Sequence, residues 1–262
     1  MARDTAPPNG AGRRRTVLAD GTYAAIKAMI RDHQISPGQH IGIDELSRGL
    51  SVSQTPVREA LARLEADGLV TKIPLRGYEA TALLTVQQFD DLFQFRALIE
   101  PWAACEASRR ATRRENEALQ AELERAEHIE RAGGPTTYAE FIEHDTRLHA
   151  LVARASGSSF VEEAFLRTHC HMHLFRVYKA TLSIDDGGSE QSAGAQGGDF
   201  VRSMFAEYYQ GGTRPLAVAQ HIEIVGAIAG GAPDSAGELM LHHIESSRKR
   251  FIPAVEALHA QG

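Results

Sequence analysis

Residues 43–77 read IDELSRGLSVSQTPVREALARLEADGLVTKIPLRG, and this stretch decides the fold of the N-terminal third of the chain. Its periodicity and turn residues predict a helix, a tight turn, a second helix and two short strands, in this order, at 45–50, 51–53, 55–67, 69–73 and 77–81. Gly68 ends the second helix, because glycine readily adopts the left-handed conformation that stops a helix. This order of elements predicts a winged helix-turn-helix with a small β-wing.

The residues before that stretch extend the prediction to a whole domain. Apolar side chains at helical spacing predict a helix at 22–33, and residues 39–43 are a short candidate strand. Together they give a DNA-binding domain over residues 18–82. Residues 1–17 are rich in alanine, proline, glycine and arginine, so we expect a disordered tail there.

The rest of the chain is predicted to be an all-α helical bundle over residues 86–259, which makes the whole protein mainly α. The predicted helices lie at 86–110, 113–132, 136–155, 159–182, 200–210, 214–230 and 234–259. Residues 183–199 are rich in glycine, serine and aspartate and are expected to form a loop. Phe89, Phe95 and Trp102, in the first of these helices, are expected in the core.

Charge is distributed unevenly along the chain. The net charge of −6 by itself argues against a protein that binds nucleic acid. Residues 1–82 carry 11 Lys and Arg against 9 Asp and Glu, whereas residues 83–262 carry 17 against 25. Only the first third does not repel a polyanion, so affinity for DNA must come from a few well-placed cations, doubled by dimerisation.

The second helix of the motif has the side chains that a major-groove reader needs on its open face. Arginine pairs with guanine and glutamine with adenine, and a cation beside a glycine at the wing tip can enter the minor groove. The candidate DNA contacts are Arg48, Gln54, Thr55, Arg58, Arg76 and Gly77. Arg48 is the weakest of them and is also compatible with a solvated side chain, and such motifs also occur in protein-interaction modules.

Four residues of the C-terminal part have the spacing of a metal site. Asp145 and His149 are four residues apart, so both project from one face of a helix. His221 and His243 lie at equal distances from the centre of a turn at 230–234, which places them level on two antiparallel helices. One Asp and three His inside a helical bundle favour a divalent metal ion.

Two known families resemble these two regions. Residues 43–61, 64–70 and 74–77 resemble the GntR family of bacterial regulators, except that Gln54 stands where the family usually has arginine, which predicts a shifted operator sequence. The stretch FIEHDTRLH at 141–149 resembles the Phe-x-x-x-Asp-x-x-Phe-His motif of the FCD ligand-sensing domain, with Leu148 in place of the aromatic. The later histidine motifs of that domain match 220–222 and 240–244, and the FCD domain indicates the FadR subfamily.

The resemblance implies what the second domain holds. In this family such residues commonly bind Zn, Ni or Mn, here through Asp145, His149, His221 and His243, with zinc taken as the first candidate. His242 competes with His243, which fits the 22-residue spacing better. Family members bind small organic acids over the metal with the help of an arginine that corresponds to Arg96, although pairing of Arg96 with Glu100 is a serious alternative. His173 and Arg176, three residues apart on one helix, are further candidates for the effector pocket.

These observations predict a homodimeric transcription regulator, expected to be a repressor rather than an enzyme, that binds a palindromic operator and senses a small carboxylate. The alternatives are a metal-dependent hydrolase and a regulator whose metal is purely structural. No apolar run is long enough for a membrane span. Cys105 and Cys170 have no metal-binding or disulfide spacing, so we expect reduced thiols in a cytoplasmic protein.

Overall fold

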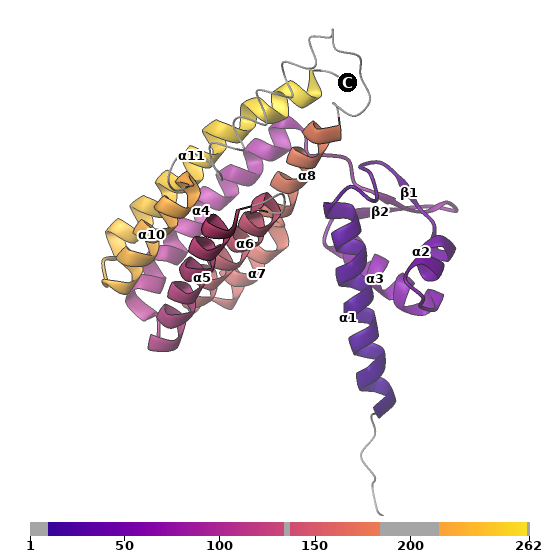
Figure 1. Ribbon diagram of the computed structural model, residues 1–262, viewed down its shortest axis with the longest axis horizontal. Helices are drawn as coiled ribbons and strands as arrows, with labels where there is room; N and C mark the ends of the chain where they lie inside the picture. The colour runs from indigo at the N-terminus through magenta and orange to yellow at the C-terminus, as the bar shows by residue number, and fades with distance from the viewer. Residues whose placement is uncertain (1–9, 134–136, 184–214, 261–262) are drawn as a thin grey trace, which may run out of the picture. The chain divides into compact units, whose positions relative to one another are not determined.

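The computed structural model describes residues 10–133, 137–183 and 215–260, and the chain divides into two compact units, residues 1–83 and 84–262. The prediction of a mainly helical protein is confirmed. The first unit is a winged helix-turn-helix with a small sheet, and the second is a bundle of helices (Figure 1). None of the described helices is long and apolar enough to cross a membrane.

Three helices and three strands build the first unit. In chain order they are α1 (Gly10–Arg31), β1 (His40–Ile41), α2 (Ile43–Gly49), α3 (Gln54–Ala66), β2 (Val70–Ile73) and β3 (Gly77–Ala80). Helix α3 packs on α1 and α2 through buried residues at helical spacing, which include Val57, Leu61 and Leu64. Because these side chains fill the core, the opposite face of α3 is left exposed.

The sheet has the strand order β1-β3-β2 and is antiparallel throughout. Strands β2 and β3 form the wing hairpin, with Val70 opposite Ala80 and Ile73 opposite Gly77. At the tip of the wing, Gly77 has a φ of 97°, a conformation that suits glycine. The candidate strand at 39–43 is confirmed in shorter form as β1.

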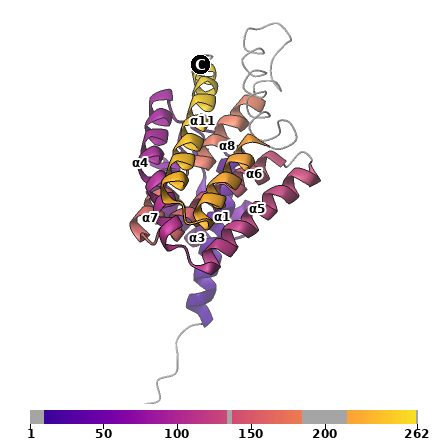
Figure 2. The same cartoon turned by 90° about the vertical axis from the view of Figure 1, so that its left-hand side faces the viewer.

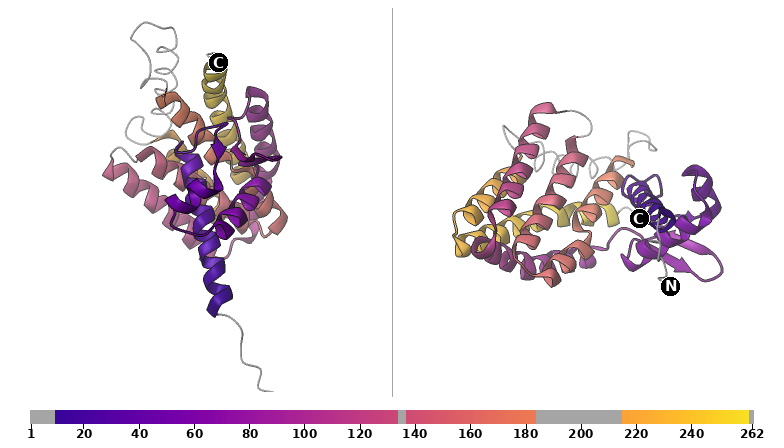
Figure 3. Two further views of the ribbon diagram at one scale, coloured as in Figure 1. Left: turned by 90° about the vertical axis from the view of Figure 1, so that its right-hand side faces the viewer. Right: turned by 90° about the horizontal axis from the view of Figure 1, so that it is seen from below.

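Helix α1 begins earlier than expected. It starts at Gly10, so the prediction of a disordered tail over 1–17 is wrong for residues 10–17, and residues 1–9 lie outside the described part. Residues 10–31 contain no proline, and the consecutive arginines at 13–15 favour the helix. Figure 3 shows α1 extending past the other helices of its unit.

Seven helices are described in the second unit. They are α4 (Val86–Arg110), α5 (Arg113–Ala132), α6 (Thr137–Ala155), α7 (Ser159–Thr168), α8 (Cys170–Ser183), α10 (Leu216–Ala229) and α11 (Pro233–His259), of which α4 and α5 begin with a capping box.

Helices α4 and α11 are the two longest described helices of the bundle, and they pack against each other. They run antiparallel and side by side (Figure 2), with Asp90 bound to Arg248 near one end and Pro101 close to Gly237 further along. A Cβ atom at Gly237 would lie 2.5 Å from Sγ of Cys105 and 3.3 Å from the carbonyl oxygen of Pro101, so a larger residue would force the Cys105 side chain or the helices to shift. Helices α6 and α10 also pack on α4, and α5 packs on α6 and α10.

Two helical predictions need comment. The helix expected at 159–182 is two helices, because His169 adopts a left-handed conformation with a φ of 45° and separates α7 from α8. The helix predicted at 200–210 and the loop predicted at 183–199 lie outside the described residues, apart from Ser183.

The expectation that Phe89, Phe95 and Trp102 lie in the core is wrong for two of them. Phe89 is fully buried, whereas Phe95 and Trp102 are 39% and 46% exposed. A helix with core on two sides still presents one stripe outward, and the sequence alone does not show which apolar residues fall on that stripe.

Candidate functional site

The structure brings the four predicted metal ligands together in the middle of the helical bundle. Asp145 and His149 come from α6, His221 from α10 and His243 from α11, and all four are buried. Nε2 of His149 lies 3.3 Å from Nε2 of His243, and Nε2 of His221 lies 3.4 Å from Oδ1 of Asp145. The turn at 230–234 does join two helices, as the equal spacing of the histidines predicted.

Each of the three histidines has its outer nitrogen hydrogen-bonded to a neighbour. Nδ1 of His149 lies 2.5 Å from Oε2 of Glu100, and Nδ1 of His243 lies 2.9 Å from Oε1 of Gln220. Both oxygens only accept hydrogen bonds, so Nδ1 carries the proton in both rings and the lone pair is on Nε2. The Nε2 lone pairs of His149 and His243 therefore face each other.

His221 is oriented by a longer chain of hydrogen bonds. Its Nδ1 lies 3.0 Å from Nε2 of His144, whose own Nδ1 lies 3.1 Å from Glu122. Arg125 and Arg147 both bind the Glu122 carboxylate and keep it in place. Because His144 donates to Glu122, its Nε2 accepts the proton of His221, and Nε2 of His221 also carries a lone pair.

This arrangement fits a metal ion. Two ligand nitrogens at about 2.0–2.1 Å from a tetrahedral ion are roughly 3.3 Å apart, which matches the separation between His149 and His243. The ligand atoms of His149, His221 and His243 lie within 4.8 Å of one another, and so do those of His144, Asp145 and His221. These buried His and Asp side chains can therefore bind a metal ion.

The surroundings of His221 and His243 favour the neutral form of both side chains. Burial, followed by the neighbouring histidines, holds the pKa of His221 and His243 well below its usual value. The imidazoles of His221 and His243 are therefore neutral near pH 7, which is the form that ligates a metal. The inward-facing lone pairs and the negative charge of Asp145 repel one another, and a bound metal ion would offset this repulsion.

Arg96, the predicted effector-binding residue, is buried beside this cluster. Its guanidinium pairs with the carboxylate of Glu100, and Nη1 lies 3.2 Å from Sγ of Cys170. Burial would raise the pKa of Glu100, but Arg96 and then His149 outweigh it and lower that pKa to about 2. The expected Arg96–Glu100 pair is thus present, and the same carboxylate also orients His149.

His171 is a polar residue of the same stretch as His173 and Arg176 that does not share their helix face in the sequence, and the structure places it at the cluster. This ring is buried on α8, with Nε2 3.9 Å from Oδ2 of Asp145 and its centre 5.2 Å from that of His149. Of the two predicted pocket residues on α8, His173 is half-buried and Arg176 fully buried. Because the chain is interrupted at His169, the residues of α8 face other directions than they would on one continuous helix, and the sequence pattern did not indicate this change.

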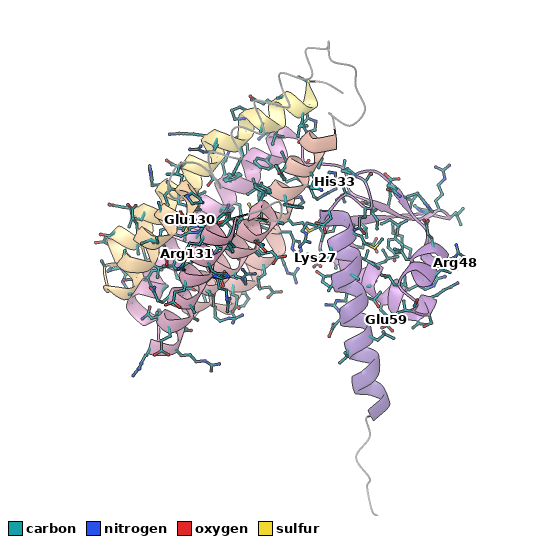
Figure 4. The ribbon with its side chains drawn as sticks, in the orientation of Figure 1. Lys27, His33, Arg48, Glu59, Glu130 and Arg131 are labelled. Carbon is teal, nitrogen blue, oxygen red and sulfur yellow. The ribbon has the colours of Figure 1, made fainter. Side chains whose placement is uncertain are left out.

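The candidate DNA contacts lie on the surface of the first unit. Thr55 and Arg58 are exposed on α3, Arg76 is exposed at the wing tip, and Figure 4 shows Arg48 on the outer side of α2. Gln54 donates a hydrogen bond to Asp44 and accepts one of 3.3 Å from Arg58. The two candidate base-reading side chains of α3 are therefore joined to each other.

Comparison with known proteins identifies both units. The family model described as bacterial regulatory proteins, gntR family, matches residues 18–79, and the FCD domain model matches residues 91–195. The Nta operon transcriptional regulator of Aminobacter aminovorans is 28% identical over 217 residues, which cover 83% of this chain and 86% of that protein. The uncharacterized HTH-type transcriptional regulator YdhC of Bacillus subtilis (strain 168) is 27% identical, with 61% of this chain and 70% of that protein covered.

A solved structure shows the same fold. E. coli McbR/YncC superimposes with a TM-score of 0.63 at 15% identity, and the match covers 93% of this chain and 98% of that one. Fold and family matches together define a DNA-binding transcription regulator, not an enzyme, which removes the hydrolase alternative. The chain belongs to the GntR family and carries an FCD domain, as in the FadR-like subfamily.

Proposed function

We propose that this protein is a repressor that binds a palindromic operator as a homodimer and responds to a small carboxylate bound at a metal ion. Residues 18–82 read the operator and residues 86–259 hold the metal and the effector. The protein acts in the cytoplasm, where its DNA target lies. The single observation that supports this proposal best is the convergence of three inward-facing Nε2 atoms on a buried cluster with Asp145.

The proposed metal ligands are Asp145, His149, His221 and His243, with zinc as the first candidate and nickel or manganese as alternatives. Zinc accepts three nitrogens and one oxygen in tetrahedral geometry, and the 3.3 Å separation between the nitrogens of His149 and His243 suits that geometry. An ion that expands its coordination would accept an effector carboxylate as a further ligand.

The proposed effector contacts are Arg96, His173 and Arg176, to which we add His171. Arg96 is a buried cation beside the cluster, and guanidinium binds carboxylates in a bidentate manner. Its present partner, Glu100, also holds His149. An effector that drew Arg96 away from Glu100 would therefore act on a metal ligand as well, and this provides a physical link between effector binding and the helices that carry the ligands.

The proposed DNA contacts are Arg48, Gln54, Thr55, Arg58, Arg76 and Gly77. The first turn of α3 offers free backbone N–H groups to a phosphate, and Arg58 is placed to reach a guanine in the major groove. Arg76 enters the minor groove at the wing. Dimerisation presents two such surfaces to two half-sites, which is why a palindrome is expected.

The test is fluorescence anisotropy with labelled DNA from upstream of the protein's own gene, at moderate salt. The metal-loaded protein should bind a fragment tightly, and a panel of small mono- and dicarboxylates should contain at least one that weakens binding. Absence of any binding fragment would refute the DNA-binding proposal. If no carboxylate changes the affinity while a chelator lowers the melting temperature, the metal is structural instead.

A further inference from the structure

The outer face of α4 carries a stripe of exposed side chains with a regular order. Asp91, Phe95, Leu98, Trp102 and Arg109 follow one another at intervals of four, three, four and seven residues, which keeps them on one side of the helix. Phe95, Leu98 and Trp102 are 39%, 76% and 46% exposed. We call these five residues the α4 stripe.

Scattered exposed apolar residues are ordinary, but three large ones in a row are not. The neighbouring helix α11 adds Leu241, which is 37% exposed and, from the contacts of Asp90 with Arg248 and Pro101 with Gly237, lies near the level of Leu98. Figure 2 shows α4 along an outer edge of the bundle beside α11. An apolar patch with charged ends is the expected form of a protein–protein interface.

The order of charges along the α4 stripe indicates which partner fits. An acidic residue, Asp91, stands at its N-terminal end, a basic residue, Arg109, stands at its C-terminal end, and the apolar residues lie between them. A copy of the same stripe turned end for end has the complementary order. The stripe therefore matches itself in an antiparallel pairing, which is what a two-fold symmetric interface requires.

We propose that the α4 stripe is the centre of an isologous dimer interface, in which α4 packs antiparallel on α4 of a second copy of this chain. This rests on the homodimer of the proposed function and specifies its contact surface. With the two-fold axis near residue 100, Asp91 lies opposite the partner's Arg109, and Leu98 lies opposite the partner's Trp102. Symmetry makes each contact twice, over about 27 Å of helix.

Both end charges already have neighbours on their own helix, and these leave the pattern intact. Asp91 accepts a 2.8 Å hydrogen bond from the neutral side chain of Gln87 and keeps its negative charge. Arg109 and Arg110 share the single carboxylate of Glu106, so that end keeps a net positive charge. The ends of the stripe thus remain opposite in sign.

The charge order provides a test by substitution in the full-length protein, with the dimer dissociation constant measured by sedimentation equilibrium. Asp91→Arg and Arg109→Asp should each weaken dimerisation roughly tenfold, because each turns two attractive contacts into repulsive ones. The double variant should recover the wild-type constant to within about threefold. Mixing the two single variants should restore dimers as heterodimers, since both end contacts are then attractive. Arg113→Asp, at an exposed position outside the stripe, should change nothing.

The apolar residues at the centre of the α4 stripe can be tested separately, by dimerisation and by the fluorescence of Trp102. Leu98→Glu should weaken dimerisation roughly a hundredfold or more, as expected for a central anchor. Trp102 is the chain's single tryptophan, so its emission should move to longer wavelength as the wild-type protein is diluted below the dissociation constant, and Leu98→Glu should show the shifted emission at all concentrations.

Two results would overturn this interface. If the single charge variants and Leu98→Glu dimerise like the wild type, the dimer uses another surface. If these variants stay dimeric but change operator affinity, the stripe is covered by the chain's own DNA-binding unit. Neither metal, carboxylate nor DNA is present in the dimerisation measurements, so failure here leaves the proposed regulation by a metal-bound effector to be judged by its own test.

Discussion

Two adjacent histidines on α11 allow a sharp test of the proposed metal site. His243 is buried, its Nδ1 binds Gln220 and its Nε2 faces His149, whereas His242 is exposed on the other side of the same turn. His243→Gln removes one ligand nitrogen from the cluster. His242→Gln makes the same chemical change one residue away and serves as its matched control.

The size of the effect follows from linkage. A metal at a hundred times its dissociation constant stabilises the folded protein by about 2.7 kcal/mol. For a unit the size of residues 84–262 this corresponds to a rise in melting temperature of roughly 5–11 °C. Loss of a residue that only hydrogen-bonds to a metal ligand lowers metal affinity about 10- to 100-fold. Loss of the ligand itself should therefore lower metal affinity at least about 100-fold. At the same metal concentration the variant should then gain only about 0.4 kcal/mol, or 1–2 °C.

The assay is thermal unfolding of chelator-treated protein titrated with Zn²⁺, together with metal content measured after purification. His242→Gln should retain the full rise in melting temperature and bind one ion for each chain. If His243→Gln retains the same rise, or if His242→Gln is the variant that loses it, the assignment of the ligands is refuted. Measuring each variant without metal first separates any effect on folding from the effect on binding.

Three further predictions concern other parts of the molecule. Arg58→Ala should weaken operator binding by about 1–3 kcal/mol and relax the base preference at one position of each half-site, whereas Arg63→Ala, whose partner is Asp20, should have little effect in the same anisotropy titration. Glu122→Gln should lower metal affinity about 10- to 100-fold in a chelator competition experiment, because it loosens the chain of hydrogen bonds that orients His221; unchanged affinity would show that this chain has no influence on the metal. The metal-free protein should lose stability as the pH falls below about 6.5, because burial, then neighbouring histidines and Arg96, lower the pKa of three histidines in the folded state while the unfolded chain still takes up their protons. The loss should approach about 1.4 kcal/mol per pH unit for each such histidine in urea titrations between pH 7.5 and 5, and a stability that is flat over this range would contradict it.

The sequence by itself determined the winged helix-turn-helix. Its helices, turn and hairpin are short, and each is specified by local features such as the left-handed glycines at 68 and 77 and the core spacing within α3. Local chemistry is visible in a sequence because the interacting residues are close together along the chain. The four predicted metal ligands could be selected from the sequence for a similar reason. Asp145 and His149 lie one helical turn apart, and His221 and His243 are symmetric about the turn between two helices.

Only the tertiary structure decided what surrounds those ligands. The partners that orient them are 22 to 77 residues away along the chain: Glu100 for His149, His144 for His221, Glu122 for His144 and Gln220 for His243. No periodicity relates such residues, because their contacts depend on how separate helices pack. The same holds for Trp102, whose helical phase is readable from the sequence, whereas its exposure depends on which sides of α4 the other helices cover.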